Sequence, residues 1–383
     1  MAANHFDYII VGNGLAGLQL ALAFSEDPFF DNNRIALIDK SKKDTNDKTW
    51  CFWEKKSGKW EDVLFKTWSK GFFHSSNNTL HLSLEPYTYK MVRSIDFYSS
   101  IKKKMARKSN LVFIDDEVQH IEENNEVKVL GKRSEYFAQK VFDSRIPKEY
   151  FKNSDSYYRI FQHFKGWIIE TETDVFDPET FTMMDYRIKH RNDTTFTYVL
   201  PFSKRRALVE FTFFTPYIVA LDLYDNYLKD YIENILRTNT YEVIENEAGN
   251  IPMTNFPFEK YNSANITKIG TGGGWVKGST GYSFKRTEKK IVKIIENLKN
   301  SKIPSTGLYR KRFQFYDSVF LNVLKNKNDK GEWVFDTFYS KNSVNKMFKF
   351  LDEETSLAEE IRIISPLFSW TFLKAFFKTL YAF

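Results

Sequence analysis

The first forty residues contain two short apolar runs with a helical pattern between them. Residues 7–11 (DYIIV) are mostly apolar over the length of a strand. From about residue 14, apolar side chains recur at helical spacing, and residues 34–40 (RIALIDK) form a second short apolar run. This order predicts a β-α-β unit, the opening of a dinucleotide-binding α/β fold.

Similar patterns continue along the rest of the chain. Strands are predicted at 78–91, 111–114, 117–121, 126–130 and 140–145, and helices at 94–108, 286–298 and 356–361. The strands between 111 and 145 are expected to return to the first sheet. Residues 156–215 are rich in strand signals, and 194–215 predict a hairpin.

The turn after the first strand has the glycine spacing of a dinucleotide-binding loop, G-x-G-x-x-G. The residues predicted to bind the cofactor here are Gly12, Gly14, Leu15, Ala16 and Gly17, followed by Asp39 and Lys40. Gly14 would let the backbone approach a pyrophosphate, and Gly17 would let helix and strand pack closely. Asp39 ends the second strand, where an acid can accept a hydrogen bond from a ribose hydroxyl. A purely structural glycine turn would leave this acid unexplained.

A second glycine-rich stretch favours FAD as the bound dinucleotide. KIGTGGGWVKGSTGYSFKRT (268–287) resembles the second flavin contact of flavin hydroxylase-like folds, and VFDSR (141–145) resembles their strand-end motif. Backbone N–H groups of this stretch are expected near the flavin. The residues predicted to contribute are Gly270, Gly272, Gly273, Gly274, Thr280 and Gly281. Hydroxylases often carry Gly-Asp where this chain has Gly270-Thr271, which argues against ordinary hydroxylase chemistry.

These signals predict an α/β protein with a flavin hydroxylase-like, Rossmann-type FAD/NAD(P)-binding fold, an antiparallel-sheet substrate domain and a helical C-terminal part. The FAD-binding domain is expected in three parts, at 1–80, 101–150 and 263–300. The substrate-binding sheet is expected at 151–262, with an insertion at 81–100. Residues 301–383 are expected to be helical and to include a membrane-interface helix.

Composition narrows the class of protein. Aromatic residues make up 17% of the 383 residues, which indicates an unusually aromatic interior or cavity. A single cysteine, Cys51, excludes internal disulfides and favours a reducing cytoplasm. The formal net charge of +7 comes without a nucleic-acid motif, so an anionic lipid surface is a better expected partner than nucleic acid. The sequence also predicts no signal peptide, no membrane-spanning helix and no metal site.

One carboxylate stands in the middle of a strongly apolar strand, ALVEFTFF (207–214). Because side chains alternate along a strand, Glu210 shares a face with Thr212, and Phe211 lies on the opposite face. Burial of a lone carboxylate costs free energy. An ion pair with Arg205 or Arg206, or an exposed strand face, would remove that cost. The alternative is an acid kept neutral by its surroundings and used in chemistry.

Five segments in a fixed order resemble a known family. They are NDKTWCFWE (46–54), FTMMDYR (181–187), ALVEFTFF (207–214), IGTGGGWVKGSTGYSF (269–284) and NKMFKFLDEETSLAEEIRIIS (345–365). Over nearly its whole length the chain resembles the lycopene cyclases, specifically the bacterial lycopene β-cyclases. The resemblance implies β-ring closure on linear lycopene to γ-carotene and β-carotene. This net isomerisation nevertheless requires reduced FAD, with NAD(P)H as the electron source.

The resemblance also implies roles for particular residues. The acid at the position of Glu210 is the essential carboxylate of the family; as a protonated acid it would protonate an end-group alkene and later take a proton back. Asp185 is expected either to orient Glu210 or to act as a second acid, unless it simply pairs with Arg187. The aromatic residues predicted to line the substrate pocket are Trp50, Trp53, Phe211, Phe213 and Trp275, with core packing as the alternative.

The last stretch of the chain is the candidate for contact with a membrane, where lycopene dissolves. Residues 366–383 (PLFSWTFLKAFFKTLYAF) are aromatic and place Lys374 and Lys378 on one helix face, which is typical of an interfacial helix. A peripheral position on the inner face of the cell membrane follows, unless this is a buried C-terminal helix. Two rival functions stay open: a redox flavoprotein (monooxygenase or polyprenyl reductase) and a non-catalytic carotenoid-binding flavoprotein. The sequence predicts no oligomeric state.

Overall fold

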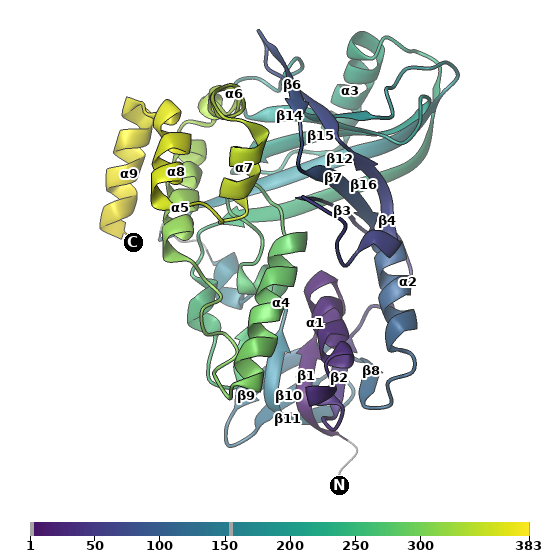
Figure 1. Cartoon of the computed structure of the whole chain (residues 1–383), viewed down its shortest axis with the longest axis vertical. Helices are drawn as coiled ribbons and strands as arrows, with labels where there is room; N and C mark the ends of the chain where they lie inside the picture. The colour runs from purple at the N-terminus through teal and green to yellow at the C-terminus, as the bar shows by residue number, and fades with distance from the viewer. Residues whose placement is uncertain (1–3, 153–155, 383) are drawn as a thin grey trace.

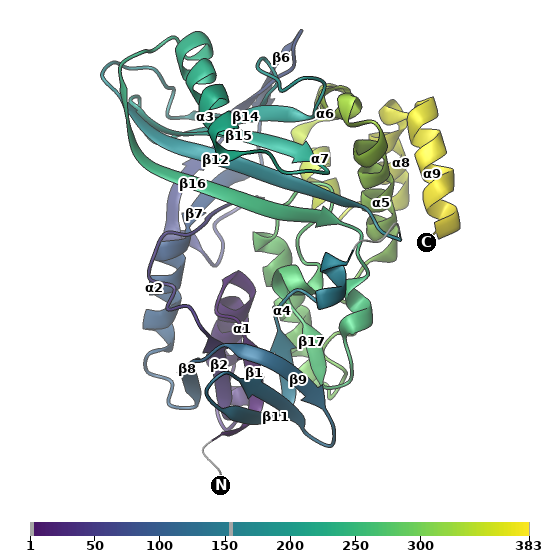
Figure 2. The same cartoon turned by 180° about the vertical axis from the view of Figure 1, so that it is seen from behind.

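A computed structural model describes residues 4–152 and 156–382, and it confirms the predicted α/β class (Figures 1 and 2). A nucleotide-binding lobe lies at one end of the molecule, a large twisted sheet at the other, and a group of C-terminal helices beside them. The polypeptide passes between the lobe and the large sheet several times, so residues of both line the space between them.

The nucleotide-binding lobe is built on a sheet of order β8-β2-β1-β11-β10-β9, with β17 paired to β11. Its strands are β1 (His5–Val11), β2 (Ile35–Asp39), β8 (Leu111–Asp115), β9 (Val118–Glu123), β10 (Val127–Gly131), β11 (Glu135–Asp143) and β17 (Ile266–Lys268). The helices of the lobe are α1 (Leu15–Glu26), α2 (Ser94–Met105) and α4 (Phe284–Lys299). Strands β1, β2, β8 and β11 run parallel. The predicted β-α-β unit and the return of the later strands are thus confirmed.

The large sheet has the order β16-β12-β15-β14-β13-β5-β6 and is antiparallel except for the pair β13–β5. Its strands are β5 (Lys70–His74), β6 (Thr79–Ser83), β12 (Arg159–Thr171), β13 (Thr180–Asp185), β14 (Thr195–Pro201), β15 (Arg206–Thr215) and β16 (Tyr241–Thr254). Strands β14 and β15 form the predicted hairpin. Residues 70–83 belong to this sheet, although the expected division placed residues up to 80 in the FAD-binding domain.

A small third sheet, β3-β7-β4, lies between the lobe and the large sheet. Its strands are β3 (Thr49–Glu54), β4 (Leu64–Trp68) and β7 (Thr88–Arg93). The single strand predicted at 78–91 is therefore wrong, because β6 and β7 belong to different sheets. Pro86 stands between them and cannot donate a ladder hydrogen bond, which suits a break in the strand.

The two faces of the large sheet have different neighbours. Helix α3 (Leu221–Asp230) covers one face, and the nucleotide-binding lobe faces the other (Figures 1 and 2). Along β15, Phe211 and Phe213 pack in the cluster under α3, whereas Leu208 and Phe214 belong to the cluster on the lobe side. The period of two along β15 thus decides which side chains can reach the space between lobe and sheet.

The C-terminal region is helical, as predicted. It contains α5 (Lys311–Asn326), α6 (Gly331–Lys341), α7 (Val344–Leu351), α8 (Leu357–Ile364) and α9 (Trp370–Ala382). A capping box between Ser356 and Glu359 starts α8. Short helical turns occur at Pro28–Phe30, Glu61–Val63, Lys148–Phe151, Tyr231–Ile235, Phe258–Tyr261, Gly270–Gly273, Asn328–Lys330 and Ser365–Leu367. Within the described ranges, no helix has the length and apolar character that a membrane crossing requires.

Candidate active site

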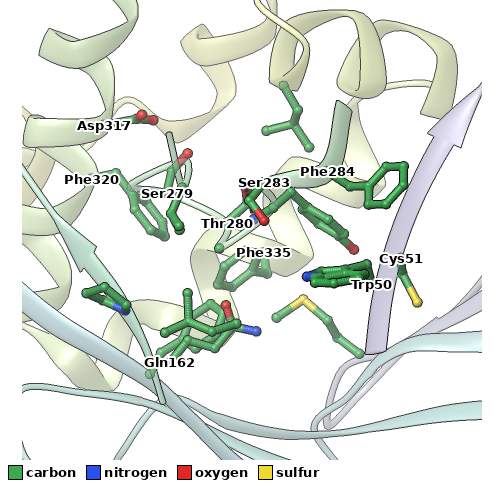
Figure 3. A pocket seen from close by; sticks show the side chains of 18 of the residues that line it. Trp50, Cys51, Gln162, Ser279, Thr280, Ser283, Phe284, Asp317, Phe320 and Phe335 are labelled. Carbon is green, nitrogen blue, oxygen red and sulfur yellow. Dashed lines mark hydrogen bonds between the residues drawn. The ribbon is translucent and has the colours of Figure 1, made fainter. Parts of the chain in front are cut away.

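A cavity of about 1080 Å³ lies between the nucleotide-binding lobe, the large sheet and the C-terminal helices. Figure 3 shows side chains from many elements around it, among them Trp50 of β3, Gln162 of β12, Phe320 of α5 and Phe335 of α6. The glycine loop before α1 lies in the wall of the same cavity, as does Glu210 of β15. One continuous space therefore joins the predicted cofactor loop to the predicted acid.

The glycine loop has the shape expected of a phosphate cradle. A Cβ atom on Gly17 would lie 1.8 Å from the carbonyl oxygen of Gly12, so helix and strand pack too closely there for any side chain. A Cβ atom on Gly14 would meet no heavy atom within 4 Å, and Gly14, Leu15, Ala16 and Gly17 all line the cavity. Because no side chain caps α1, its first-turn N–H groups are available to an anionic ligand.

Asp39 and Lys40, the two residues predicted to contact the cofactor after the second strand, form different contacts. Both carboxylate oxygens of Asp39 accept backbone N–H groups, from Asn13 at 2.7 Å and from Ser41 at 2.8 Å. Asp39 thus holds the glycine loop in place, and its remaining lone pairs are what a ribose hydroxyl would use. Lys40 instead forms an exposed ion pair with Glu117 at 2.7 Å, so its predicted cofactor contact is not supported. Neither Asp39 nor Lys40 is among the residues that line the cavity.

The second glycine-rich stretch is divided between the cavity wall and local packing. Gly270, Thr271, Thr280 and Gly281 line the cavity. Gly272, Gly273 and Gly274 do not. A Cβ atom on Gly272 would lie 2.4 Å from the carbonyl oxygen of Arg145, in the VFDSR segment, and Gly274 has a φ of +66° that favours glycine. These three glycines let the turn pack against its neighbours, and the four lining residues are the ones in reach of a ligand.

Glu210 is a buried acid on the cavity side of the large sheet. Its side chain is 7% exposed, and its Oε1 accepts a hydrogen bond from the Thr212 hydroxyl at 2.8 Å. Among the described residues it forms no ion pair, and the nearby Arg205 pairs with Asp174 instead. Burial, reinforced by the neighbouring carboxyl of Glu247, raises the pKa of Glu210 to about 8. At neutral pH the acid therefore carries its proton.

Glu247 is a second cavity-lining acid that the sequence patterns did not identify. Gly166 of β12 pairs with Glu210 of β15 on one side and with Glu247 of β16 on the other. The two carboxyl groups are in contact, and Glu247 Oε2 also accepts a hydrogen bond from the Thr49 hydroxyl at 2.7 Å. Burial raises the pKa of Glu247 as well. The sequence around Glu247 is polar and gives no signal for it, and only the pairing with β12 places it here.

Three tyrosines line the cavity next to the acids. The hydroxyl of Tyr89 lies 2.7 Å from the hydroxyls of both Tyr198 and Tyr282. Tyr198 pairs across the hairpin with Glu210, so both side chains are on the cavity face. Burial raises the pKa of all three tyrosines far above the ordinary value, and it raises the pKa of the adjoining Cys51 thiol to about 12. The wall beside the acids is thus aromatic and neutral.

The predicted aromatic lining is partly correct. Trp50 and Trp53 line the cavity, and Trp53 stacks on Phe348 with ring centroids 4.3 Å apart. Phe211 and Phe213 lie on the opposite face, under α3, and Trp275 is buried in the core of the nucleotide-binding lobe. The pocket prediction is wrong for these last three residues. Other lining aromatics, which the patterns did not single out, are Phe196, Phe214, Phe284, Phe320, Phe335 and Phe338.

Asp185 is not part of this site. Its carboxylate is fully buried, pairs with the Arg187 guanidinium and accepts a hydrogen bond from Tyr231 at 2.7 Å. Tyr231 belongs to the cluster under α3, and Asp185 does not line the cavity. The predicted catalytic role is therefore wrong for Asp185, and the alternative holds, in which it pairs with Arg187 to fix a turn.

Comparison with known families accounts for this arrangement. A family model described as lycopene cyclase protein matches residues 7–377, nearly the whole chain. The chain belongs to the lycopene cyclase family. This match confirms the family resemblance that the five sequence segments indicate. No curated protein sequence matches it significantly.

Solved structures show which fold this cyclase family member shares. A geranylgeranyl bacteriochlorophyll reductase-like protein from Thermoplasma acidophilum is 12% identical, with a TM-score of 0.60 over 99% of this chain and 100% of that one. A probable FAD-dependent monooxygenase from Pseudomonas aeruginosa is 10% identical, with a TM-score of 0.56 over 87% of this chain and 100% of that one. The halogenase PltM, solved with phloroglucinol and FAD, is 10% identical. Its TM-score is 0.58 over 97% of this chain and 90% of that one. At these identities the likeness shows the flavin-binding fold alone.

Proposed function

We propose that this cyclase family member closes the end rings of lycopene by protonation from Glu210, with reduced FAD bound at the glycine loop. The observation that carries the proposal is the neutral, buried Glu210 in an aromatic cavity that also contains a dinucleotide cradle. Ring closure of a polyene is an isomerisation, so its steps are proton transfers without a net redox change.

The residues that would hold FAD are the described lining residues of the two glycine-rich stretches. The pyrophosphate would lie on the N–H groups at the start of α1, where Gly14 leaves room for it. The backbone at Gly270, Thr271, Thr280 and Gly281 would face the remainder of the cofactor. Bound FAD, reduced at the expense of NAD(P)H, would supply negative charge close to a developing cation.

Glu210 supplies the proton. An alkene carbon is a poor proton acceptor, so the donor must face the substrate directly, without water to take the proton first. The carboxyl of Glu210 meets this requirement because it is buried, neutral and open only to the cavity. Proton transfer produces a cation at the chain end, the next double bond attacks it, and a ring carbon then loses a proton. The Glu210 carboxylate takes up that proton, so atoms and electrons balance without an external acid.

The cavity wall stabilises the cation between the two proton transfers. Aromatic faces attract cations through their ring quadrupoles. Trp50, Trp53 and the tyrosines at 89, 198 and 282 line the same cavity as the acid and carry no charge at neutral pH. A neutral phenol is a weak nucleophile, so the wall can stabilise the cation without trapping it.

The C-terminal helices would give the substrate its entrance. Phe368 lines the cavity and yet is 74% exposed, so it stands at the mouth; the neighbouring Trp370 is 69% exposed. Lys374 lies over the Trp370 ring, with its charge 5.4 Å from the ring centroid. Exposed aromatics beside lysines favour an anionic membrane interface. We therefore propose a peripheral position on the membrane surface, with the cavity mouth facing the lipid.

Expression in a lycopene-accumulating bacterium, followed by pigment chromatography, tests the proposed function. The expected products have one or two β-rings and the mass of lycopene. A redox flavoprotein of the same fold would instead change the mass of its product and consume NAD(P)H in proportion to turnover. A non-catalytic carotenoid-binding protein would leave lycopene unchanged while the protein is folded and loaded with FAD, and that result would refute the proposal.

A further inference from the structure

Glu210 and Glu247, two of the acids that line the cavity, come together beside Gly166. Strand β12 runs between β15 and β16, and Gly166 is the residue that faces both Glu210 and Glu247 in register. A Cβ atom at Gly166 would lie 3.3 Å from Cβ of Glu210 and 2.9 Å from Cδ1 of Leu208. Any larger residue would therefore press on Leu208 and on the base of the Glu210 side chain.

Separate hydroxyl groups hold the two carboxyls in this position. Thr212 donates to Glu210 from the same strand, at 2.8 Å. Thr49 donates to Glu247 from β3, a strand of the small third sheet, at 2.7 Å. Each carboxyl thus has one oxygen that a threonine hydroxyl holds in place. These two hydrogen bonds restrict the orientation of both carboxyl groups.

Neither acid is neutralised by a direct ion pair with a described residue, although one cation, Lys48, also lines the cavity. Among the described residues neither Glu210 nor Glu247 forms an ion pair, and the neighbouring Glu245 accepts from the Asn46 amide at 2.9 Å. The other titratable or charged groups lining the cavity are Asp47, Lys48, Cys51, Tyr89, Tyr198, Tyr282, Tyr316, Asp317 and Tyr339. In such surroundings two adjacent carboxylates cannot both ionise readily, and the pair retains a proton that an isolated carboxyl would lose.

We propose that Glu247 is a positioning residue that keeps the reactive proton on Glu210 between turnovers. The inference rests on the proposed function and adds a second acid to it. In the resting pair, Glu210 is protonated and donates to the Glu247 carboxylate, which Thr49 holds in place. When Glu210 gives its proton to the alkene, two carboxylates face the cation. Their repulsion drives the return of a proton from the ring to Glu210, and the pair is restored.

The pH dependence of turnover distinguishes a role of Glu247 in keeping the proton on Glu210 from a purely structural role. Glu247→Gln keeps the size and the hydrogen-bonding capacity of the side chain but removes its charge. Purified, FAD-loaded Glu247→Gln is expected to cyclise lycopene at pH 6, with its alkaline limb moved down by about one pH unit or more. Gly166→Ala presses on the base of the Glu210 side chain and is expected to displace its carboxyl from Glu247, which would move the limb in the same direction. Unchanged limbs in both variants would overturn the proposal, and so would loss of activity at every pH with FAD still bound.

Infrared titration of the carboxylic-acid carbonyl band measures the protonation of Glu210 and Glu247, and it does not require turnover. The wild-type band is expected to persist above pH 7, to be absent from Glu210→Gln, and to titrate at lower pH in Glu247→Gln. If the wild-type protein shows this band but cyclises nothing, the proposed function fails and the shared proton stands. If the band titrates identically in wild type and Glu247→Gln, the role of Glu247 is refuted whatever the activity.

Discussion

Replacement of the buried acid is expected to make the protein more stable at alkaline pH. Glu210 has a pKa of about 8 in the folded protein, against an ordinary value of 4.5. The folded state therefore binds more protons than the unfolded state between these two values. Stability is lost as pH rises through this window, because the unfolded chain releases the proton first. Glu210→Gln removes the titration and keeps the shape.

The size of the effect follows from the width of the window. Within it, each pH unit lowers the free energy of unfolding by about 1.4 kcal/mol. From pH 6 to pH 8 the loss comes to about 2 kcal/mol, because about half of the Glu210 side chains have ionised by the upper end. The stability of Glu210→Gln relative to wild type is thus expected to rise by about 2 kcal/mol over this interval.

Equilibrium urea unfolding, followed by circular dichroism at both pH values, measures the difference. Glu242→Gln is a matched control, because Glu242 is an exposed residue of β16 and its replacement is expected to change nothing between pH 6 and pH 8. Equal wild-type and Glu210→Gln pH dependences would mean that Glu210 is already ionised in the folded protein. An ionised Glu210 has no proton to donate, so that result would refute the reasoning.

Three further predictions concern the rest of the structure. Asp185→Asn removes the buried carboxylate from its pair with the exposed Arg187 guanidinium, and the loss of these charge-assisted hydrogen bonds is expected to lower the free energy of unfolding in urea by about 2 kcal/mol. The folded, FAD-loaded fraction is expected to retain near-wild-type turnover; loss of turnover in that fraction would return Asp185 to the active site. Gly17→Ala places a methyl group against the Gly12 carbonyl, so the purified protein is expected to lack the FAD absorption spectrum; full FAD content would contradict the proposed cradle. Replacement of exposed Phe368 and Trp370 by Ser is expected to weaken co-sedimentation with anionic vesicles by about tenfold for each side chain, without loss of FAD; unchanged sedimentation would refute the membrane contact.

The nucleotide-binding lobe could be predicted from the sequence because its signals are local. The glycine spacing, the two apolar strands and the helix between them all fall within residues 5–39, and each depends on near neighbours. The residues that share a face with Glu210 were also predictable from the period of two along β15, although not which face meets the cavity. That same period places Phe211 and Phe213 on the opposite face, so the prediction that they line the pocket conflicted with the pattern itself.

Glu247 and the packing of the C-terminal helices depend on contacts between distant segments. Strand β16 is polar and largely exposed, so no apolar alternation marks it as a strand. Only its pairing with β12 shows that Glu247 lies beside Gly166 and faces Glu210. Similarly, Asp185 and Glu210 are both acids in strand-rich segments, and only the fold shows that they lie on opposite faces of the sheet. Register between strands is long-range information that a single sequence does not display.

Turnover by the purified protein tests the role of Glu210 most directly. Wild type and Glu210→Gln, both loaded with FAD and chemically reduced, are supplied with lycopene in lipid vesicles, and the products are separated by chromatography and weighed by mass spectrometry. Wild type is predicted to form ring-closed products with the mass of lycopene and without stoichiometric consumption of reductant, and Glu210→Gln to form none. Cyclisation by Glu210→Gln at the wild-type rate would contradict the account.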